Sequence, residues 1–274
     1  TNNIFIELEK ANNEEMEIIY KLKNLNEYRM LSYRARSIVT GTNPYHKAEK
    51  AVNELMNILN DPLLRTEEQA LSYPALITYY HILALVHESL AKNNEALTYK
   101  KKLIEVMEDN PDKLKENISN YVISVFSLLS PCLILNRYDD LLQYISKLKL
   151  IEQNYPERIS RGDKLLIFTG SSIFELRMHI NTGEFSRSDK NIYEIETGLG
   201  EFSDKIIKDD VLHCYYMIGY AYFGAGRIED ALKWINRILN DKDINPESRL
   251  AVIAKILNLI IHYELGNFDL LGSL

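Results

Sequence analysis

Apolar residues recur every three or four positions on both sides of short polar turns along most of the chain. The clearest example runs from Tyr215 to Pro246, where two apolar stretches flank the turn Gly224-Ala225-Gly226-Arg227. This spacing places apolar side chains on one face of an α-helix, and glycine readily reverses the chain at a helix end. We therefore predict two antiparallel helices here, closed by Pro246, which cannot continue a helix.

The same pattern returns when other parts of the chain are aligned on Ala231, the first small residue of the second helix. A proline follows fifteen residues after Ala231, and prolines fall at the same offset from Ala96 and Leu141. Weaker copies complete one continuous array over residues 1–274. The six predicted hairpins are centred near Ala48, Ala96, Leu141, Ser188, Ala231 and Leu271.

The repeat is longer than usual for helical hairpins. Successive centres are 48, 45, 47, 43 and 40 residues apart, whereas a common helical-hairpin repeat has ~34 residues. Much of the extra length has helical spacing, for example at Arg65–Ser72 and Asp112–Tyr121. We therefore expect lengthened first helices and not long loops.

Both ends of the array are atypical. Residues 4–25 have the apolar spacing of another helix, which we predict to be an N-terminal cap or half of a hairpin. The last hairpin reaches Leu274 before its second helix is long enough to bury Ile256, Leu257, Ile260 and Ile261. We expect further chain, or another surface, to cover those side chains.

The unit around Ala231 resembles the tetratricopeptide repeat. It has aromatic residues at Tyr215 and Tyr222 and small residues at Gly219 and Ala231, and small residues let two helix axes approach closely. The resemblance implies an all-α fold, in which about six antiparallel helix–turn–helix repeats wind into a right-handed superhelix.

Two stretches, Tyr215–Leu271 and Asn60–Ala75, look similar to a family of uncharacterised bacterial helical-repeat proteins. This resemblance implies no activity, because that family has no assigned function. Two units depart from the tetratricopeptide pattern, with Leu129 and Leu176 where a glycine or alanine is usual. We expect these bulkier side chains to hold their helix pairs further apart.

Composition disfavours two classes of partner. The 32 basic and 39 acidic side chains give a net charge of −7, and no basic run extends beyond Lys100–Lys102, so we do not expect this segment to bind nucleic acid. No apolar run approaches the ~18–20 residues that span a bilayer.

Cys132 and Cys214 lie among apolar or aromatic residues and are predicted to be buried free thiols. Free thiols favour a reducing, cytoplasmic location.

Histidines invite a metal hypothesis, because His87, His179 and His262 occupy the same or adjacent repeat positions. Equivalent positions on neighbouring packed helices are ~10 Å apart, whereas zinc needs ligands at ~2.0–2.1 Å. We therefore predict no metal and no other cofactor.

Catalytic signatures are also absent from the sequence. It contains no Gly-x-Ser-x-Gly, HExxH, P-loop or GxGxxG motif, and paired carboxylates such as Asp139-Asp140 are expected to begin second helices, where they favour the helix dipole. Arg177 with His81 or His213 is the one polar combination that could converge. We predict that the chain is not an enzyme.

A superhelix of this type has a concave face lined by its first helices. Positions fifteen and eleven residues before each centre form an apolar and aromatic row, which suits a peptide segment, although the same row also suits the core of a tightly wound superhelix. The candidate binding residues are Tyr33, His81, Phe126, Arg177, Tyr216 and Tyr220.

These observations predict a non-enzymatic scaffold that binds a peptide or another protein and that can also form homo-oligomers. The alternative hypothesis is the sensor half of a peptide-responsive transcriptional regulator, whose DNA-binding domain would lie outside these residues. A basic helix-turn-helix segment elsewhere in the reading frame would favour that alternative.

Overall fold

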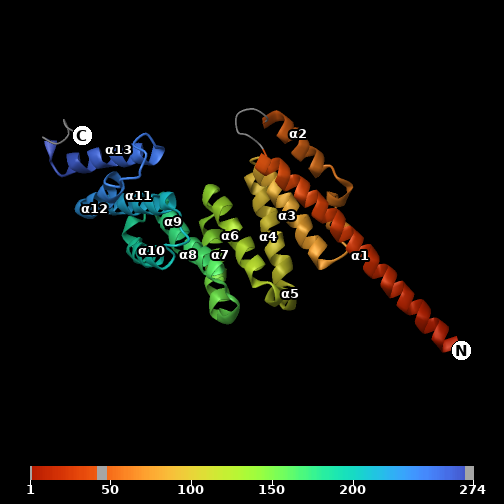
Figure 1. Ribbon diagram of the computed structural model, residues 1–274. Coiled ribbons are helices and arrows are strands. Elements are labelled where there is room, and N and C mark those ends of the chain that lie inside the picture. Colours follow the sequence, from red (N-terminus) through yellow and green to blue (C-terminus); the bar gives the residue numbers. More distant parts are fainter. Residues whose placement is uncertain (1, 42–47, 269–274) are drawn as a thin grey trace. The chain divides into compact units, whose positions relative to one another are not determined.

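The computed structural model describes residues 2–41 and 48–268, and the secondary structure of this part of the chain consists of helices joined by turns and short loops, without a β-strand. The prediction of an all-helical protein is therefore confirmed for these residues. The chain divides into two compact units, residues 1–136 (unit 1) and 137–274 (unit 2), whose helices are labelled in Figure 1. Each unit is described by itself below.

In unit 1, α3 packs against both α1 and α4, and α6 covers the other side of α4. Its core includes Ile82, Ile104 and Val125, which are fully buried. The elements are α1 (Asn2–Gly41), α2 (Ala48–Leu59), η1 (Pro62–Leu64), η2 (Glu67–Gln69), α3 (Tyr73–Ser89), α4 (Asn93–Glu108), α5 (Pro111–Glu116) and α6 (Ile118–Ile134).

In unit 2, α11 packs against α12 and α12 against α13, and a helical segment interrupted by a π-turn precedes them. Leu176, Ile195, Ile218 and Ile235 are fully buried in its core. The elements are α7 (Tyr138–Asn154), η3 (Pro156–Arg158), α8 (Arg161–Phe168), the π-turn η4 (Thr169–Ile173), α9 (Phe174–Thr182), η5 (Phe185–Arg187), α10 (Asp189–Glu201), α11 (Lys208–Gly224), α12 (Ile228–Leu239) and α13 (Arg249–Glu264).

Four helix-to-helix turns share one backbone geometry. Each has a residue of positive φ, namely Ala91, Asn136, Gly183 or Gly226, followed by a residue near φ −85° that precedes the next helical segment. In the last turn the Arg227 N–H donates to the Tyr222 carbonyl at 2.9 Å, which satisfies a carbonyl that the helix end leaves free. These turns follow one another at the same spacing as the predicted hairpin centres.

Close packing accompanies the turn at Gly226. A Cβ added to Gly219 would lie 2.8 Å from Cδ1 of Ile235, and Ala231 is fully buried. The small residues expected from the sequence therefore do let α11 and α12 approach each other. The first turns of α7 and α12 carry the expected acidic pairs, which favour the positive end of the helix dipole.

Several predicted boundaries are wrong. The helix predicted at residues 4–25 is the first part of α1, which runs without interruption to Gly41. Arg65–Ser72 contains the 3₁₀ turn η2 and no α-helix. Asp112–Tyr121 breaks at Asn117, whose side chain accepts from the Asn120 N–H at 3.2 Å and caps α6. Local capping therefore outcompetes helical spacing at Asn117.

The prolines also act differently from the prediction. Pro111 and Pro156 begin the next helical segments, where a missing N–H costs nothing, and α12 ends at Leu239, well before Pro246. The hairpin centred near Leu271 lies outside the described residues.

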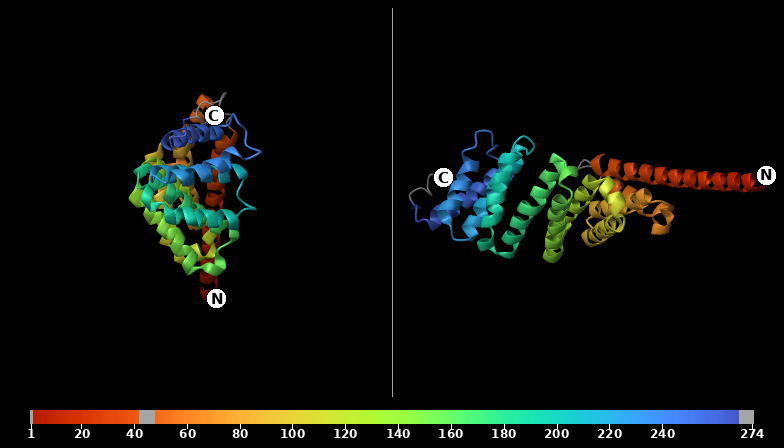
Figure 2. Two further views of the ribbon diagram at one scale, coloured as in Figure 1. Left: turned by 90° about the vertical axis from the view of Figure 1, so that its left-hand side faces the viewer. Right: turned by 90° about the horizontal axis from the view of Figure 1, so that it is seen from below.

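Side-chain hydrogen bonds fix α1 to the segment between α2 and α3. The Asn24 amide donates to the Gln69 carbonyl and accepts from the Leu71 N–H, both at 3.0 Å. The buried Tyr28 hydroxyl donates to the Leu63 carbonyl at 2.6 Å. These contacts hold the C-terminal half of α1, while its N-terminal half projects beyond the other helices of unit 1 (Figure 2).

Candidate binding pocket

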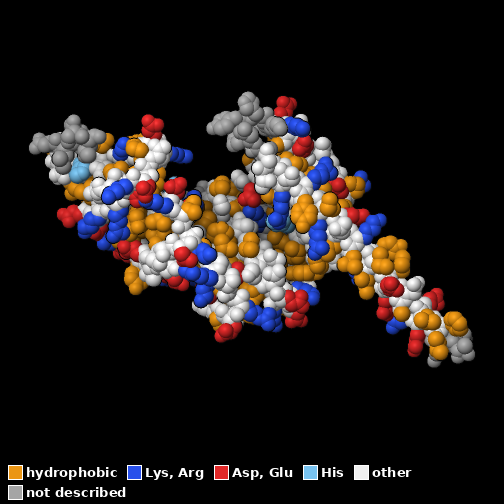
Figure 3. Space-filling model, in the orientation of Figure 1, with side chains coloured by type: hydrophobic (Ala, Val, Ile, Leu, Met, Phe, Trp, Pro, Cys, Tyr) orange, Lys and Arg blue, Asp and Glu red, His pale blue; other side chains and the backbone are white. Residues whose placement is uncertain are grey.

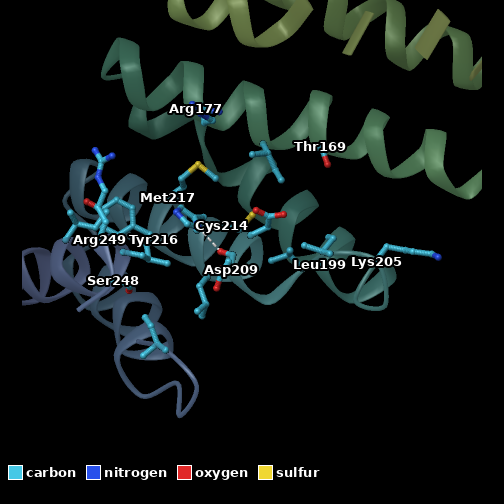
Figure 4. A pocket seen from close by; sticks show the side chains of 18 of the residues that line it. Thr169, Arg177, Leu199, Lys205, Asp209, Cys214, Tyr216, Met217, Ser248 and Arg249 are labelled. Carbon is cyan, nitrogen blue, oxygen red and sulfur yellow. Dashed lines mark hydrogen bonds between the residues drawn. The ribbon is translucent and has the colours of Figure 1, made fainter. Parts of the chain in front are cut away.

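Unit 2 contains a pocket of about 1130 Å³ (Figure 4). Its walls come mainly from the continuous helical segment α8–η4–α9, from α11 and from the start of α13, and Leu199 at the end of α10 adds to them. The connections before α11 and α13 contribute to its rim. Three helices that are separated in the sequence by α10 and α12 therefore share one concave surface. The apolar wall includes Leu165, Ile173, Phe174, Met217, Leu250 and Ile253.

Aromatic side chains extend the apolar wall on α11. Tyr216 lines the pocket, and its ring stacks on that of Tyr220 with 6.2 Å between centroids. Burial raises the pKa of Tyr216, and the neighbouring Tyr220 adds to this effect. The Tyr216 phenol is therefore neutral at physiological pH and can donate or accept a hydrogen bond.

Two arginines give the pocket its cationic groups. Arg177 lies over the ring of Phe174, 5.5 Å from its centroid, and Arg249 lies beside Tyr216 in Figure 4. Within the described ranges, neither guanidinium has a carboxylate in ion-pair distance. Each can therefore offer its N–H fork to an external carboxylate.

Acidic side chains line the same pocket. Asp209 and Asp210 belong to the first turn of α11, and Asp243 lies before α13. Asp243 is already paired with Lys208 at 2.5 Å, whereas Asp209 is in no ion pair within the described residues. In Figure 4 Asp209 lies between Tyr216 on one side and Lys205 on the other. The pocket thus combines cationic and anionic groups around an apolar wall.

Cys214 contributes a thiol to the pocket wall, a group that can take part in covalent chemistry. The residue is a free thiol and only 3% exposed. Burial raises the pKa of this thiol to about 12, and Asp210 contributes in the same direction. Because the thiolate is the reactive form, Cys214 is unreactive at neutral pH. The prediction of buried free thiols is confirmed for both cysteines.

The structure brings together the predicted candidates of unit 2. Arg177 and Tyr216 line the pocket, and Tyr220 is partly exposed next to Tyr216. Arg177 and His213, one of the two polar combinations considered from the sequence, both line the pocket. His213 Nδ1 donates to the Asp209 carbonyl at 2.7 Å, a local helix contact that orients its ring.

The other candidates belong to unit 1. Tyr33 is an exposed residue of α1, and Phe126 is a partly buried residue of α6. His81 is partly buried on α3, and its Nε2 accepts from Arg36 at 2.8 Å. Burial lowers the pKa of His81 to about 4, and the charges of Arg36 and Lys100 act in the same direction. His81 is therefore a neutral member of a packed polar network.

That network also includes a buried cation. Lys100 is 6% exposed, and its ammonium group donates to the Ser127 carbonyl at 2.8 Å and to Glu88 at 3.0 Å. These bonds connect α3, α4 and α6. Lys100 therefore has a structural role, and the short basic run that contains it does not form an open cationic patch.

Sequence reasoning missed the charged rim of the pocket. Counting back from hairpin centres finds positions within first helices, but Lys205 and Asp243 lie in the connections before them, and Arg249 is the first residue of α13. Their charge and their place before a first helix were visible in the sequence. These residues meet at one pocket because the connections after α10 and α12 both lead back to its rim.

Within residues 2–41 and 48–268, no three histidine, cysteine or acidic side chains converge as metal ligands. His87 Nδ1 donates to the Leu83 carbonyl at 2.7 Å, and His262 Nδ1 lies 3.2 Å from the Asn267 amide. The described part also contains no helix that is both long and apolar enough to span a bilayer.

No protein-family model matches the chain, and no curated protein matches its sequence.

Proposed function

We propose that this chain is a tetratricopeptide-like repeat scaffold that binds a peptide segment in the unit 2 pocket, without catalysing a reaction. The repeated turn geometry at Ala91, Asn136, Gly183 and Gly226 supports the repeat array. The pocket carries the functional proposal, because three helices that are not consecutive in the sequence line one surface with apolar, cationic and anionic groups.

The size of the pocket supports a peptide. Pockets for small molecules usually measure ~300–1,000 Å³, and this one, at about 1130 Å³, exceeds that range. Its apolar wall at Ile173, Phe174 and Met217 suits one or two apolar side chains of a ligand. A peptide of a few residues would fill the volume.

The charged side chains of the pocket indicate which groups a bound peptide would carry. Arg177 and Arg249 can each bind a carboxylate through two parallel hydrogen bonds, and Tyr216, which lines the same pocket, can supply a further donor. Asp209 offers an acceptor for a basic group elsewhere on the ligand. We therefore propose a peptide that has an apolar side chain next to an acidic residue or a C-terminal carboxylate.

A display library of random 12-residue peptides, selected against the purified protein, would test this proposal. Fluorescence anisotropy would then give the dissociation constant of each selected peptide. Truncation of a central aromatic contact commonly costs 2 kcal/mol or more, so we expect Tyr216→Ala to weaken binding at least ~30-fold. Arg177→Ala should weaken peptides with a carboxylate more than their amide analogues.

Tyr193→Ala is the matched control, because Tyr193 is an exposed tyrosine of α10 that does not line the pocket. Binding should be unchanged in this variant. Peptides that bind the Tyr216→Ala and Arg177→Ala variants as tightly as the original protein would show that the pocket is not the binding site. A sensor in a transcriptional regulator would use the same pocket, and a DNA-binding segment in the full reading frame would favour that role.

A further inference from the structure

In the described part of unit 1, no other segment buries the N-terminal half of α1. Residues 4–23 are all exposed, and they include large apolar side chains such as Phe5, Leu8, Ile19 and Leu22. Figure 3 shows hydrophobic side chains along this projecting part of the helix. A helix of ~20 residues without tertiary contacts is only marginally stable in water, so a partner on this surface would stabilise it.

Most of the exposed apolar residues of α1 form a stripe that continues over its packed half, whereas Ile6, Ile18 and Tyr20 point elsewhere. Successive helix residues are turned by about 100°, and the members of the stripe lie within about 60° of the direction of Ile19. Every member is exposed. The stripe consists of Phe5, Leu8, Asn12, Met16, Ile19, Leu22, Asn26, Met30 and Tyr33. The same face also carries two charged residues, Glu15 and Lys23, at about 40° on either side of Ile19, with Ile4 and Arg34 at its edges.

The stripe lies on the face of α1 opposite to the one that packs in unit 1. The buried residues of α1 include Leu25, Tyr28, Leu31 and Ala35, and Tyr28 is nine positions, or two and a half helical turns, after Ile19. Packing within unit 1 therefore leaves the whole stripe free for a second helix.

The stripe is symmetric about Ile19: apolar residues and asparagines occur at the same distances before and after it. If two copies of α1 lie antiparallel with Ile19 at the two-fold axis, apolar residues face apolar residues and the two asparagines face each other. The opposed pairs are Phe5 with Tyr33, Leu8 with Met30, Asn12 with Asn26, Glu15 with Lys23, Met16 with Leu22, and Ile19 with itself.

Charge also favours the antiparallel arrangement. Residues 7–17 contain five glutamates and one lysine, whereas residues 21–36 contain five basic residues and one glutamate. Antiparallel copies place the acidic half of one helix beside the basic half of the other, while parallel copies would place like charges together. A polar asparagine pair within an apolar seam additionally selects one register.

We propose that two copies of this chain associate through α1, as an antiparallel helix pair centred on Ile19. The contact spans residues 5–33 of each copy, about 42 Å at the rise of an α-helix. The interface is self-complementary, as a two-fold dimer requires. It uses a different surface from the peptide pocket, so neither proposal depends on the other.

Sedimentation equilibrium of the purified chain tests the association. We expect a dimer at micromolar concentration and at least a tenfold larger dissociation constant for Leu8→Glu, which places a charge in the seam. Ile6→Glu is the matched control: Ile6 is 61% exposed, Leu8 is 60% exposed, and Ile6 points away from the stripe. Circular dichroism would verify that both variants remain helical.

Spin labels at Ile6→Cys test the orientation, because Cys132 and Cys214 are buried and leave one accessible thiol. Antiparallel pairing centred on Ile19 separates the two labels by about 39 Å along the helix axis, whereas parallel pairing would bring them within about 20 Å. Electron–electron double resonance measures this distance directly.

A chain that remains monomeric at about 100 µM, a dimer that tolerates Leu8→Glu, or a short distance between the labels would each overturn the proposal. A dimer that is lost on Ile6→Glu but kept on Leu8→Glu would instead place the contact on the other face of α1.

Discussion

Gly198 shows how a single missing side chain positions a helix in unit 2. A Cβ at this position would lie 2.1 Å from Cε2 of Phe168, whose ring stacks on Phe202 with 5.6 Å between centroids. Because the Phe168 ring is packed against Phe202, it cannot easily move away from an added methyl group. Gly200, two residues later in α10, has no atom within 4 Å of the same added Cβ.

We expect Gly198→Ala to lower the free energy of unfolding of unit 2 by about 1–2 kcal/mol, because overpacking costs more than the ~1 kcal/mol that alanine gains in a helix. Gly200→Ala, the matched control, should raise it by up to ~1 kcal/mol. Trp234 is the one tryptophan and packs near α10, so its fluorescence in a urea titration reports the change. Equal effects of the two substitutions would contradict the close contact with Phe168.

His81 provides a prediction on pH. Its pKa is about 4 in the folded chain and about 6.5 when exposed, so the unfolded chain binds more protons between these values. The stability of unit 1 is therefore unaffected by His81 above pH 6.5 and falls as the pH drops from 6.5 to 4. The loss attributable to His81 is about 3 kcal/mol when complete.

His81→Gln separates this effect from the titration of carboxylates. Glutamine can still accept from Arg36 but does not titrate. We expect urea denaturation followed by far-UV circular dichroism to show a smaller loss of stability from pH 7 to pH 4.5 in the variant than in the original chain. The same dependence on pH in both proteins would show that His81 is not held neutral by the fold.

At the scale of elements, the sequence predicts the positions of the turns between helices better than the ends of the helices. Gly226 and Gly183 have positive φ, where glycine is unstrained, whereas Ala91 adopts a φ of 57° at the equivalent place. A left-handed conformation costs an alanine roughly 1 kcal/mol. The turn at Ala91 is therefore formed against a local preference, and the surrounding contacts impose it.

We expect Ala91→Gly to raise the free energy of unfolding by about 0.5–1 kcal/mol and Gly226→Ala to lower it by about 1 kcal/mol. Ala225→Gly is a suitable control, because Ala225 has a φ of −80° and glycine there gains only flexibility. Urea denaturation measures all three, with Trp234 fluorescence for the substitutions near α12. A loss of stability in Ala91→Gly would exclude strain at this turn.

The ends of the helices depend on both the spacing of apolar residues and side-chain caps, and these two can disagree. Helical spacing predicted α3, α4, α11 and α12 in approximately the right places because one face of each is buried against a neighbour. It failed at Asn117, where a side-chain cap ends one helix and begins another. It also divided α1 into two segments, because the spacing of apolar residues changes where α1 leaves the body of unit 1.

At the scale of the whole molecule, the pocket links ligand binding to the stability of unit 2. Under the proposed function, a ligand contacts α8–α9, α11 and α13 together, so it must bind the folded unit better than the unfolded chain. At a ligand concentration 100 times the dissociation constant, such binding stabilises the folded state by about 2.7 kcal/mol.

We therefore expect a selected peptide to shift the urea midpoint of Trp234 fluorescence upward in the original protein and in Tyr193→Ala. The shift should be at most about a third as large in Tyr216→Ala, because ~30-fold weaker binding leaves about 0.9 kcal/mol of stabilisation. A peptide that binds but leaves the midpoint of Trp234 unchanged would place its site outside unit 2.

The sequence by itself determined the helical class, the places of the turns and the burial of Cys132 and Cys214, because these depend on neighbours a few residues away in the chain. It also placed Arg177, Tyr216 and Tyr220 together as binding candidates, since they share positions on first helices. Only the tertiary structure showed that Arg249 and Asp209 complete the pocket, and that α1 buries one face and exposes another. These features arise from contacts between segments distant in sequence, which periodicity along the chain does not specify.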